Sequence, residues 1–483
     1  MKKDRTISAI LALLMLAGIV SCGDANTPDA KDTQSNSSSE TTAETTVDLT
    51  LPPELPDKKY DGYEFNILTR VEGWGIYNNE HLVVEEENGE VLNDAIFNRN
   101  RHVEDRFDIK LVETVTTGSI SSEITQSVMA GDNSYDLVIT TYGLNLGTEY
   151  LLDWNTLQYV NLDRPWWDQN FVEAASVNGK LCSTVGNIMI THMDSVLTMF
   201  YNQKLADEYK LPDLYELVRS GSWTLPKYFE ITKNVTTDLN GDTKFDDNDR
   251  YAFVGLDGIS RLASGVKCEY VKKDSKDLPI TNFGDQHLID TVTKLRDYAA
   301  LYAADIYDPR TDSNTGGDGD RAVFRLFLND QALFYVHGLG SAQMYRDMKS
   351  DFGVIPTPKL DDTQESYFIQ PDITKQMVIP STAPDTERTS IIVEALAYEG
   401  YSYLRPLYYE TMLQNKYLRD EESIEMLDEY IYTNIGFSPS TGSSTLSSVT
   451  KSLVTGDAEI ASTLAANKSA IEEEIAQYIE LFN

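Results

Sequence analysis

Apolar and polar positions alternate strictly over residues 63–68 (Tyr-Glu-Phe-Asn-Ile-Leu), and this period of two predicts a β-strand. From about residue 93 the apolar residues follow the period of a helix instead. We expect Asn93 or Asp94 to cap this helix and the helix to run through residue 107. The apolar residues on one stripe of that helix are Ile96, Val103 and Phe107.

Strand and helix patterns continue to alternate after this helix. We expect a strand over 109–112, a helix over 120–129 that stops at Gly131, and a nearly all-apolar strand over 136–140, as buried parallel strands are. Three strands separated by two helices predict an open α/β sheet. Ligands of such sheets bind beyond the carboxyl ends of the strands. The residues expected there are Thr69, Arg70, Thr140, Thr141 and Tyr142.

Later segments extend the pattern over a body that begins near residue 57. This body is too long for one ordinary domain, so we expect two lobes of α/β class. The expected strands are 196–201, 332–336 and 352–356, and the expected helices are 205–209, 226–232, 288–302 and 321–328, with mostly helical structure from 389 to 483.

The first 22 residues have the pattern of a secretory signal peptide. Basic residues stand at positions 2, 3 and 5, an apolar run covers 7–20, and Ser21 precedes Cys22. The run is too short to span a membrane. The Ser-Cys ending resembles the bacterial lipobox, which implies cleavage before Cys22, a diacylglycerol on its sulfur and a tether to the outer face of the cell membrane. The alternative is an ordinary signal peptide with a cysteine there by chance.

The segment that follows is rich in Ser, Thr, Asp and Glu and has no large apolar residue between Ala25 and Val47. Such a segment buries too little surface to offset its ordering entropy, so we expect a disordered linker. The sequence therefore predicts a signal peptide over 1–21, and a lipidated cysteine with its linker over 22–56.

The formal charge of −37 argues against DNA, RNA or an anionic lipid surface as a ligand, and it fits a solvated surface. A hydrophobic content of 41% is enough for a sizeable core. Besides Cys22 the chain has only Cys182 and Cys268, which form either a disulfide or two buried free thiols.

Several short pieces of sequence, taken in order, carry a family likeness. They are Met-Ala-Gly-Asp-Asn-Ser-Tyr-Asp-Leu-Val at 129–138, Asn-Gly-Lys-Leu at 178–181, Phe-Tyr-Asn-Gln-Lys-Leu at 200–205, Gly-Ser-Trp-Thr at 221–224, and Asp-Phe-Gly-Val-Ile-Pro-Thr-Pro at 351–358. Together they resemble the extracellular solute-binding proteins of bacterial ABC importers, family 1, the class that includes maltose-binding protein.

The resemblance implies a type II periplasmic-binding-protein-like fold, in which two α/β lobes joined by a hinge close on a ligand. The implied protein is a monomer, is not an enzyme, needs no cofactor, and passes a sugar or oligosaccharide to ABC permease subunits. The implied boundaries are 57–190 plus about 370–415 for the first lobe and 191–369 plus about 416–483 for the second, with crossings near 188–194 and 367–377.

Sugar sites need aromatic faces for stacking and polar groups for hydrogen bonds, and the chain has 28 Tyr and 5 Trp. Trp74, in a glycine loop after the first strand, is either a stacking platform or a loop anchor. Trp166 and Trp167 are adjacent, so at most one is expected to reach a ligand while the other packs in the core. Trp223, before a helix start, is expected to be structural. The other aromatic candidates are Tyr142, Tyr335 and Tyr367.

Polar candidates complete the predicted ligand site. Asp194 lies at the expected crossing and is either a bidentate acceptor for sugar hydroxyls or an exposed hinge residue. Thr141 follows the third strand, and His337 follows strand 332–336, where a lone histidine is more often structural. The family's aromatic residue past that strand is missing, because Leu339 and Gly340 stand in its place. Arg70 is the candidate cation if the ligand is anionic.

Residues 238–249 (Asp-Leu-Asn-Gly-Asp-Thr-Lys-Phe-Asp-Asp-Asn-Asp) resemble an EF-hand or dockerin calcium loop. Thr243 replaces the usual turn glycine and Asp249 replaces the usual bidentate Glu, so the loop is either a structural Ca²⁺ site or an acidic surface turn. The expected ligands are Asp238, Asn240, Asp242, the Lys244 carbonyl, Asp246 and Asp249.

These observations favour a lipid-anchored extracellular solute-binding protein that captures a mono- or oligosaccharide and delivers it to an ABC importer. The alternatives are a lipid-anchored hydrolase acting on glycan or peptide and a stand-alone surface glycan receptor. The sequence has no His-Glu-x-x-His, Gly-x-Ser-x-Gly or Cys-x-x-Cys motif. Paired carboxylates can be hidden in so acidic a chain, so the hydrolase stays open, and peptides and polyols remain alternative cargoes.

Overall fold

The computed structural model describes residues 49–70, 82–141, 144–311, 319–408, 418, 420–456 and 458–483. Its contacts divide the chain into two units, Met1–Asp48 and Leu49–Asn483, and every element named below belongs to the second unit. The predicted signal peptide, Cys22 and most of the predicted linker lie outside the described residues.

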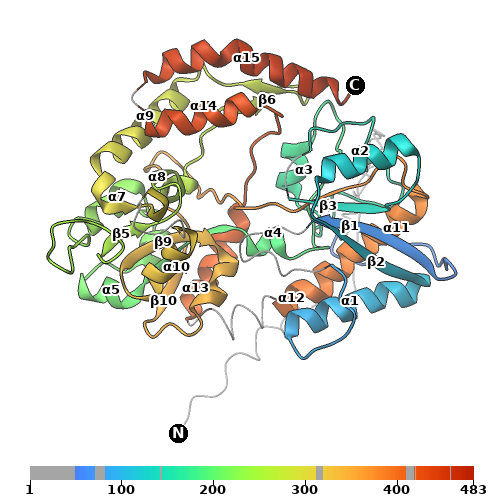
Figure 1. The fold of residues 1–483 in the computed structure, drawn as a ribbon, viewed down its shortest axis with the longest axis horizontal. Helices are drawn as coiled ribbons and strands as arrows, with labels where there is room; N and C mark the ends of the chain where they lie inside the picture. Colours follow the sequence, from blue (N-terminus) through green and yellow to red (C-terminus); the bar gives the residue numbers. More distant parts are fainter. Residues whose placement is uncertain are drawn as a thin grey trace, which may run out of the picture. The chain divides into compact units, whose positions relative to one another are not determined.

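The first sheet has the strand order β11-β3-β1-β2 (Figure 1). Its strands are β1 (Tyr63–Arg70), β2 (Ile109–Thr116), β3 (Leu137–Thr140) and β11 (Gln376–Val378). β1 runs parallel to both β2 and β3, and β11 pairs antiparallel with β3. Strand, helix, strand, helix and strand therefore build a mainly parallel sheet, which confirms the predicted α/β class.

The helices after β1 and β2 are α1 (Val91–Phe107) and α2 (Ile120–Ala130). α2 ends as expected, because Gly131 has a φ of 63° that favours glycine. The predicted start of α1 is wrong by three or four residues: the cap is Glu90 rather than Asn93 or Asp94. Asp94 lies in the first turn instead, and its carboxylate accepts N–H groups of Asn88 and Gly89 in the preceding loop.

The second sheet has the order β10-β4-β9-β5-β8. β5 pairs parallel with β9 and β8, whereas β4 is antiparallel to β9 and β10. A separate hairpin, β6-β7, is antiparallel. The strands are β4 (Leu197–Asn202), β5 (Tyr251–Val254), β6 (Val271–Lys273), β7 (Pro279–Thr281), β8 (Ile306–Tyr307), β9 (Ala332–Gly338) and β10 (Phe352–Ile355).

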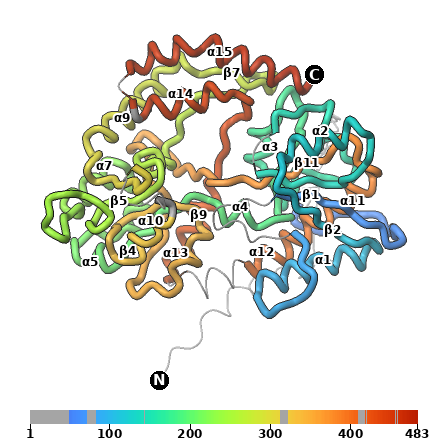
Figure 2. The backbone as a smooth tube through the Cα atoms, viewed as in Figure 1, coloured from blue at the N-terminus to red at the C-terminus, as the bar shows by residue number. Residues whose placement is uncertain are grey.

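Helices pack around both sheets, and their order along the chain can be followed by colour in Figure 2. α3 (Gln169–Ala175) packs in the same core cluster as β1, and α4 (Thr191–Asp194) directly precedes β4. The others are α5 (Gln203–Glu208), α6 (Leu214–Arg219), α7 (Leu225–Thr232), α8 (Ile259–Leu262), α9 (Gln286–Leu301), α10 (Gly319–Leu328), α11 (Thr386–Glu399), α12 (Arg405–Leu407), α13 (Glu421–Glu425), α14 (Ser444–Thr455) and α15 (Ile460–Glu480).

Each sheet is covered on both faces, as buried mainly parallel sheets require. In the first sheet, Phe65 and Ile67 of β1 pack with α1 and α11, while Leu68 packs with α2 on the other side. In the second sheet, Phe200 of β4 packs with α10, and its neighbour Met199 packs with α5, α6 and α7. We call the first sheet with its helices the first lobe, and the second sheet with its helices the second lobe.

The chain passes between the lobes in segments that hydrogen-bond to each other. The Asp372 N–H donates to the Ser195 carbonyl at 2.7 Å, and the Ser195 hydroxyl donates to the Ile373 carbonyl at 2.5 Å. A third segment joins them, because the Ile369 N–H donates to the Asn434 carbonyl at 2.9 Å. We call these the crossing segments. The exact residue boundaries of the lobes stay a prediction.

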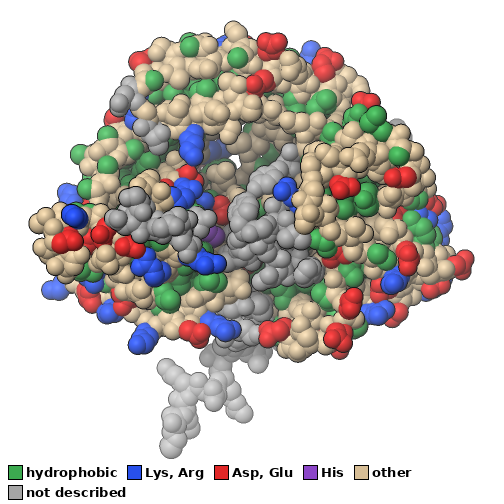
Figure 3. Space-filling view, viewed as in Figure 1, with side chains coloured by type: hydrophobic (Ala, Val, Ile, Leu, Met, Phe, Trp, Pro, Cys, Tyr) green, Lys and Arg blue, Asp and Glu red, His purple; other side chains and the backbone are tan. Residues whose placement is uncertain are grey.

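No helix among the described residues is long and apolar enough to cross a bilayer. On the face shown in Figure 3, Lys and Arg side chains are interspersed with Asp and Glu. The surface on this side is therefore mixed in charge despite the overall charge of −37.

Candidate functional site

The carboxyl ends of β1 and β3 occur at Arg70 and Thr140. Arg70 is exposed, whereas the side chain of Thr141, directly after β3, is buried. Trp74 and Tyr142, which we expected at the same edge, lie outside the described residues. The predicted ligand roles of these four residues stay predictions.

Asp194 lies at the end of α4, in a crossing segment, and is partly exposed. Its Oδ1 accepts a short hydrogen bond from the Tyr408 hydroxyl, after α12. Gly340, in the turn after β9, packs directly against the carboxylate, and a Cβ on this glycine would clash with it. Three segments far apart in sequence therefore meet at one carboxylate, and Gly340 leaves the space that the Asp194 carboxylate fills.

His337 lies on β9, beside the same crossing. Its ring stacks on Tyr335 at a centroid distance of 5.7 Å and contacts Phe324 at 5.3 Å. Burial lowers the pKa of His337 to about 4, although nearby Asp372 acts in the opposite direction. The imidazole is therefore neutral near pH 7 and offers a hydrogen bond rather than a positive charge.

An ion pair that sequence reasoning missed stands beside His337. Arg261 of α8 and Asp372 of the crossing segment approach to 2.5 Å, and their side chains are only 14% and 17% exposed. The pair joins the second lobe to the crossing segment. The only sequence signal was a lone arginine between Ile259 and Leu262, and nothing marked Asp372 as its partner.

Three predicted aromatics lie in the core of the described structure. Trp166, Trp167 and Tyr335 are at most 2% exposed, so no ring face of theirs is open to a sugar in this arrangement. The Trp167 indole N–H donates to Glu394 at 2.9 Å, and Trp166 packs edge-on against Tyr398. Large rings gain most by leaving water, and these three serve as core.

Tyr367 and Trp223 are also largely buried. The Tyr367 hydroxyl donates to the Val218 carbonyl at 3.2 Å, which leaves little of the ring for a ligand. The Trp223 indole N–H donates to the Pro356 carbonyl at 2.9 Å, which confirms its predicted structural role.

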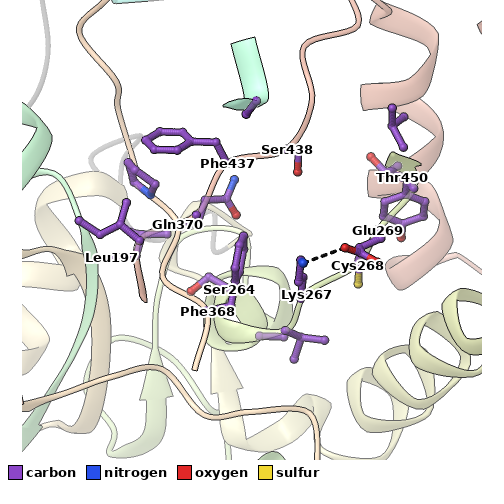
Figure 4. A pocket seen from close by; sticks show the side chains of 18 of the residues that line it. Leu197, Ser264, Lys267, Cys268, Glu269, Phe368, Gln370, Phe437, Ser438 and Thr450 are labelled. Carbon is purple, nitrogen blue, oxygen red and sulfur yellow. Dashed lines mark ion pairs between the residues drawn. The ribbon is translucent and has the colours of Figure 1, made fainter. Parts of the chain in front are cut away.

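A cavity of about 1120 Å³ lies beside the crossing segments (Figure 4). Its walls come from α3, from the chain between α8 and β6, from two crossing segments and from α14. Phe368 and Phe437 line it, and Lys267 pairs with Glu269 at 2.7 Å in its wall. The Arg261–Asp372 ion pair beside His337 also lines it, so the cavity adjoins the group around Asp194.

The predicted calcium loop folds onto its own backbone. Asp238 accepts the N–H groups of Gly241 and Thr243, and the fully buried Asp249 accepts those of Leu239 and Asp246. In the part of the chain that the structure describes, no three His, Cys, Asp or Glu side chains are grouped closely enough to hold a metal. Calcium binding stays a prediction for the ligands Asp238, Asn240, Asp242, Lys244, Asp246 and Asp249.

Cys182 and Cys268 are free thiols, so the second of the two options left open by the sequence is the one observed. Burial raises the pKa of each thiol to about 12, which makes both unreactive near pH 7.

Comparison with solved structures identifies the fold. An ABC substrate-binding protein from Listeria monocytogenes, solved in complex with cycloalternan, superposes with a TM-score of 0.53 at 13% identity, covering 86% of this chain and 100% of that one. The galacto-N-biose-/lacto-N-biose I-binding protein of an ABC transporter from Bifidobacterium longum gives a TM-score of 0.49 at 11% identity, with 87% and 99% covered.

A maltose/maltodextrin-binding domain from Bdellovibrio bacteriovorus gives a TM-score of 0.42 at 15% identity, with 86% and 98% covered. No known protein-family profile matches this chain, and no curated protein sequence matches it. The chain has the two-lobe fold of ABC-transporter substrate-binding proteins, as the sequence resemblance implied.

Proposed function

We propose that this protein is an extracellular solute-binding protein that captures a mono- or oligosaccharide between its lobes and delivers it to an ABC importer. The observation that carries the proposal is the position of Asp194. Its partly exposed carboxylate lies in a crossing segment between two α/β sheets, where closing lobes bring the carboxyl ends of strands together.

The chemistry of this position suits a saccharide. A carboxylate accepts two neighbouring hydroxyl groups at once, and a neutral His337 adds a donor or an acceptor without adding charge. The structural relative from Listeria monocytogenes was solved with cycloalternan, which supports a sugar as the cargo class.

Thermal unfolding of the full chain against a panel of mono- and oligosaccharides, polyols and peptides tests the proposal. A ligand that binds only the folded state, at one hundred times its Kd, adds about 2.7 kcal/mol of stability. We expect the unfolding temperature to rise with one saccharide class. A folded protein that responds to none of the sugars would contradict the cargo assignment, and release of shorter sugars during incubation would favour the hydrolase instead.

The Asp194→Asn variant tests the site once a ligand is found. Loss of a charge-assisted hydrogen bond costs about 1.5–3 kcal/mol, so we expect binding about 10- to 100-fold weaker by calorimetry. Asn retains an oxygen acceptor for the Tyr408 hydroxyl, which protects the local structure. Asp347→Asn, at a side chain 90% exposed, is the matched control and should bind like the parent protein.

Membrane attachment through Cys22 is part of the same proposal and rests on the lipobox resemblance alone. Labelled fatty acid should enter the parent protein and should be absent from Cys22→Ser. Equal labelling of both proteins would contradict lipidation at Cys22.

A further inference from the structure

The helix α15 extends from the second lobe towards the first. Its residues Ile460, Leu464, Ile471 and Ile475 are buried in one cluster with Leu288 and Val292 of α9 and Leu453 of α14. The Thr281 hydroxyl of β7 also donates to Glu472 at 2.9 Å. At 1.5 Å per residue its 21 residues form a rigid rod of about 32 Å. One long side of α15 is therefore fixed to the second lobe.

The residues just after α15 contact the first lobe. Phe482 is 2% exposed and packs with Leu68 of β1, Ile120 of α2 and Val138 of β3. The Leu481 carbonyl accepts the Thr148 N–H at 2.9 Å, and it lies so close to Gly147 that a Cβ there would clash. The end of a second-lobe helix thus completes a first-lobe core cluster.

A single first-lobe turn, residues 176–180, receives a second contact from the second lobe. Asp277, in the β6-β7 hairpin, accepts the Ser176 hydroxyl at 2.5 Å and the Gly179 N–H at 3.0 Å. The Asp277 carbonyl also accepts the Asn178 N–H at 3.1 Å. The hairpin residue Lys273 adds a hydrogen bond to the Ser176 carbonyl at 2.5 Å.

The same turn also contacts the residue that follows Phe482. The Asn178 amide donates to the Asn483 side-chain oxygen at 3.3 Å, and the Lys180 ammonium donates to the Asn483 carbonyl at 3.2 Å. We call the hairpin contact and the α15 contact together the strap. Its two halves come from different parts of the second lobe and meet on one turn of the first.

The strap is spatially separate from the crossing segments. The cavity of about 1120 Å³ lies between them: crossing residues such as Gln370 and Asp372 line it, and so do Lys272 and Lys273 of the hairpin and α14. The two lobes are therefore connected at two places with an open space between. A rotation of one lobe about the crossing segments has to change the distances within the strap.

We propose that the strap is an intramolecular restraint that sets how far the lobes move, and that it opposes the lobe closure which accompanies ligand capture. A contact made in one lobe arrangement and lost in another shifts the equilibrium towards the first by its differential free energy. The effect on ligand affinity rests on the proposed function, whereas the restraint itself does not.

The test uses the full chain with two matched pairs of variants. Asp277→Ala removes the carboxylate that contacts the first lobe. Its control is Asp274→Ala in the same hairpin, where the carboxylate bonds only the N–H groups of Lys276 and Leu278 among the contacts described. Phe482→Ala loosens the α15 contact, and its control is Glu480→Ala at an exposed position. Circular dichroism and thermal unfolding establish that each variant is folded.

Spin labels on p-acetylphenylalanine at positions 110 and 207, both exposed and one in each lobe, report the distance between the lobes by pulsed electron resonance. We expect a broader distance distribution for Asp277→Ala and Phe482→Ala, and distributions like the parent for both controls. We also expect the two variants to bind the saccharide found by the panel about fivefold more tightly or better.

Unchanged distance distributions in folded Asp277→Ala and Phe482→Ala would overturn the restraint. Broader distributions with weaker saccharide binding would overturn its opposition to closure. Broader distributions in a protein that binds no saccharide at all would keep the restraint and remove the proposed function instead.

Discussion

The two lobes share an α/β layering but fill their interiors differently. The second lobe packs Phe200, Phe327, Tyr335, Tyr345 and Phe352 against each other, with most centroid distances between 4.9 and 6.4 Å. The first lobe also has an aromatic core, but Trp166 and Trp167 in it pack beside a buried carboxylate, Glu394. The difference teaches that an aromatic core in this fold tolerates an ionisable group, which makes its stability sensitive to pH.

One buried titratable group in each lobe makes stability depend on pH, and the two dependences have opposite signs. Burial raises the pKa of Glu394 in the first lobe to about 7, and burial lowers the pKa of His337 in the second lobe to about 4. Glu394 therefore destabilises the fold as pH rises from about 4.5 to 7, because the unfolded chain releases this proton first. His337 destabilises the fold as pH falls from about 6.5 to 4, because the unfolded chain binds this proton first.

Phe200→Ala should cause the largest loss of stability. The ring touches four other aromatic rings and is fully buried, and removal of a buried Phe costs about 3–5 kcal/mol. Urea unfolding at pH 7 measures the loss. Phe245→Ala, at a residue 55% exposed, is the control and should change stability by less than about 0.5 kcal/mol. Similar losses in both variants would refute the aromatic core as the stabilising feature.

Glu394→Gln should remove most of the alkaline loss of stability in the first lobe. A pKa shift from 4.5 to about 7 corresponds to about 3 kcal/mol, so the variant should gain up to that amount at pH 8 and little at pH 4. Gln keeps an oxygen for the Trp167 indole N–H. The measurement is urea unfolding across pH 4–8, with Glu387→Gln, at a half-exposed ion pair with Lys58, as control. A parallel pH profile in parent and variant contradicts the assignment.

His337→Asn should flatten the acidic limb of the same profile. The imidazole is neutral and packed between rings, so the folded state binds a proton less readily than the unfolded chain. The free energy of unfolding therefore decreases as pH falls from 6.5 to 4. We expect a smaller effect than for Glu394→Gln, because His337 is partly exposed. His287→Asn, elsewhere in the second lobe on α9, serves as control. If His287→Asn flattened the limb as much as His337→Asn, the source would lie elsewhere.

Calcium should produce the smallest change. If residues 238–249 bind Ca²⁺, a concentration equal to the Kd adds about 0.4 kcal/mol, visible as a slight rise in the unfolding temperature. Asp242→Ala should abolish that rise, whereas Asp347→Ala should keep it. A rise that both variants share would reflect screening of the acidic surface, and calcium would then have no site in this loop.

Local pattern was enough to predict most of the framework. The period of two over β1, the apolar run of β3 and the glycine that ends α2 all depend on neighbours in sequence, and the structure confirms them. The start of α1 was missed because Asp94 bonds the loop before the helix rather than the helix end. Such contacts depend on the path of the preceding loop, and the hydrophobic periodicity of the sequence does not predict that path.

The candidate site was less predictable, because its contacts are long-range. Asp194 was identified from its place at a crossing, but Tyr408 lies 214 positions away and carries no sequence signal for the contact. Arg261 and Asp372 are 111 positions apart. Composition also misled: a supply of Trp and Tyr suggested stacking platforms, whereas Trp166, Trp167 and Tyr335 are core residues. The number of aromatic residues does not predict which ring faces stay exposed to solvent.

The burial of Phe482 between β1, β3 and α2 has a consequence for biosynthesis. The first lobe begins at residue 63 of a chain made from its amino end, yet one of its core clusters stays unfilled until residue 482 has been added. The second lobe also waits for late residues, because its cluster on α9 is filled by α14 and α15 up to Ile475. Both lobes therefore expose unfilled apolar surface until synthesis is nearly finished, when partly folded chains are prone to aggregate.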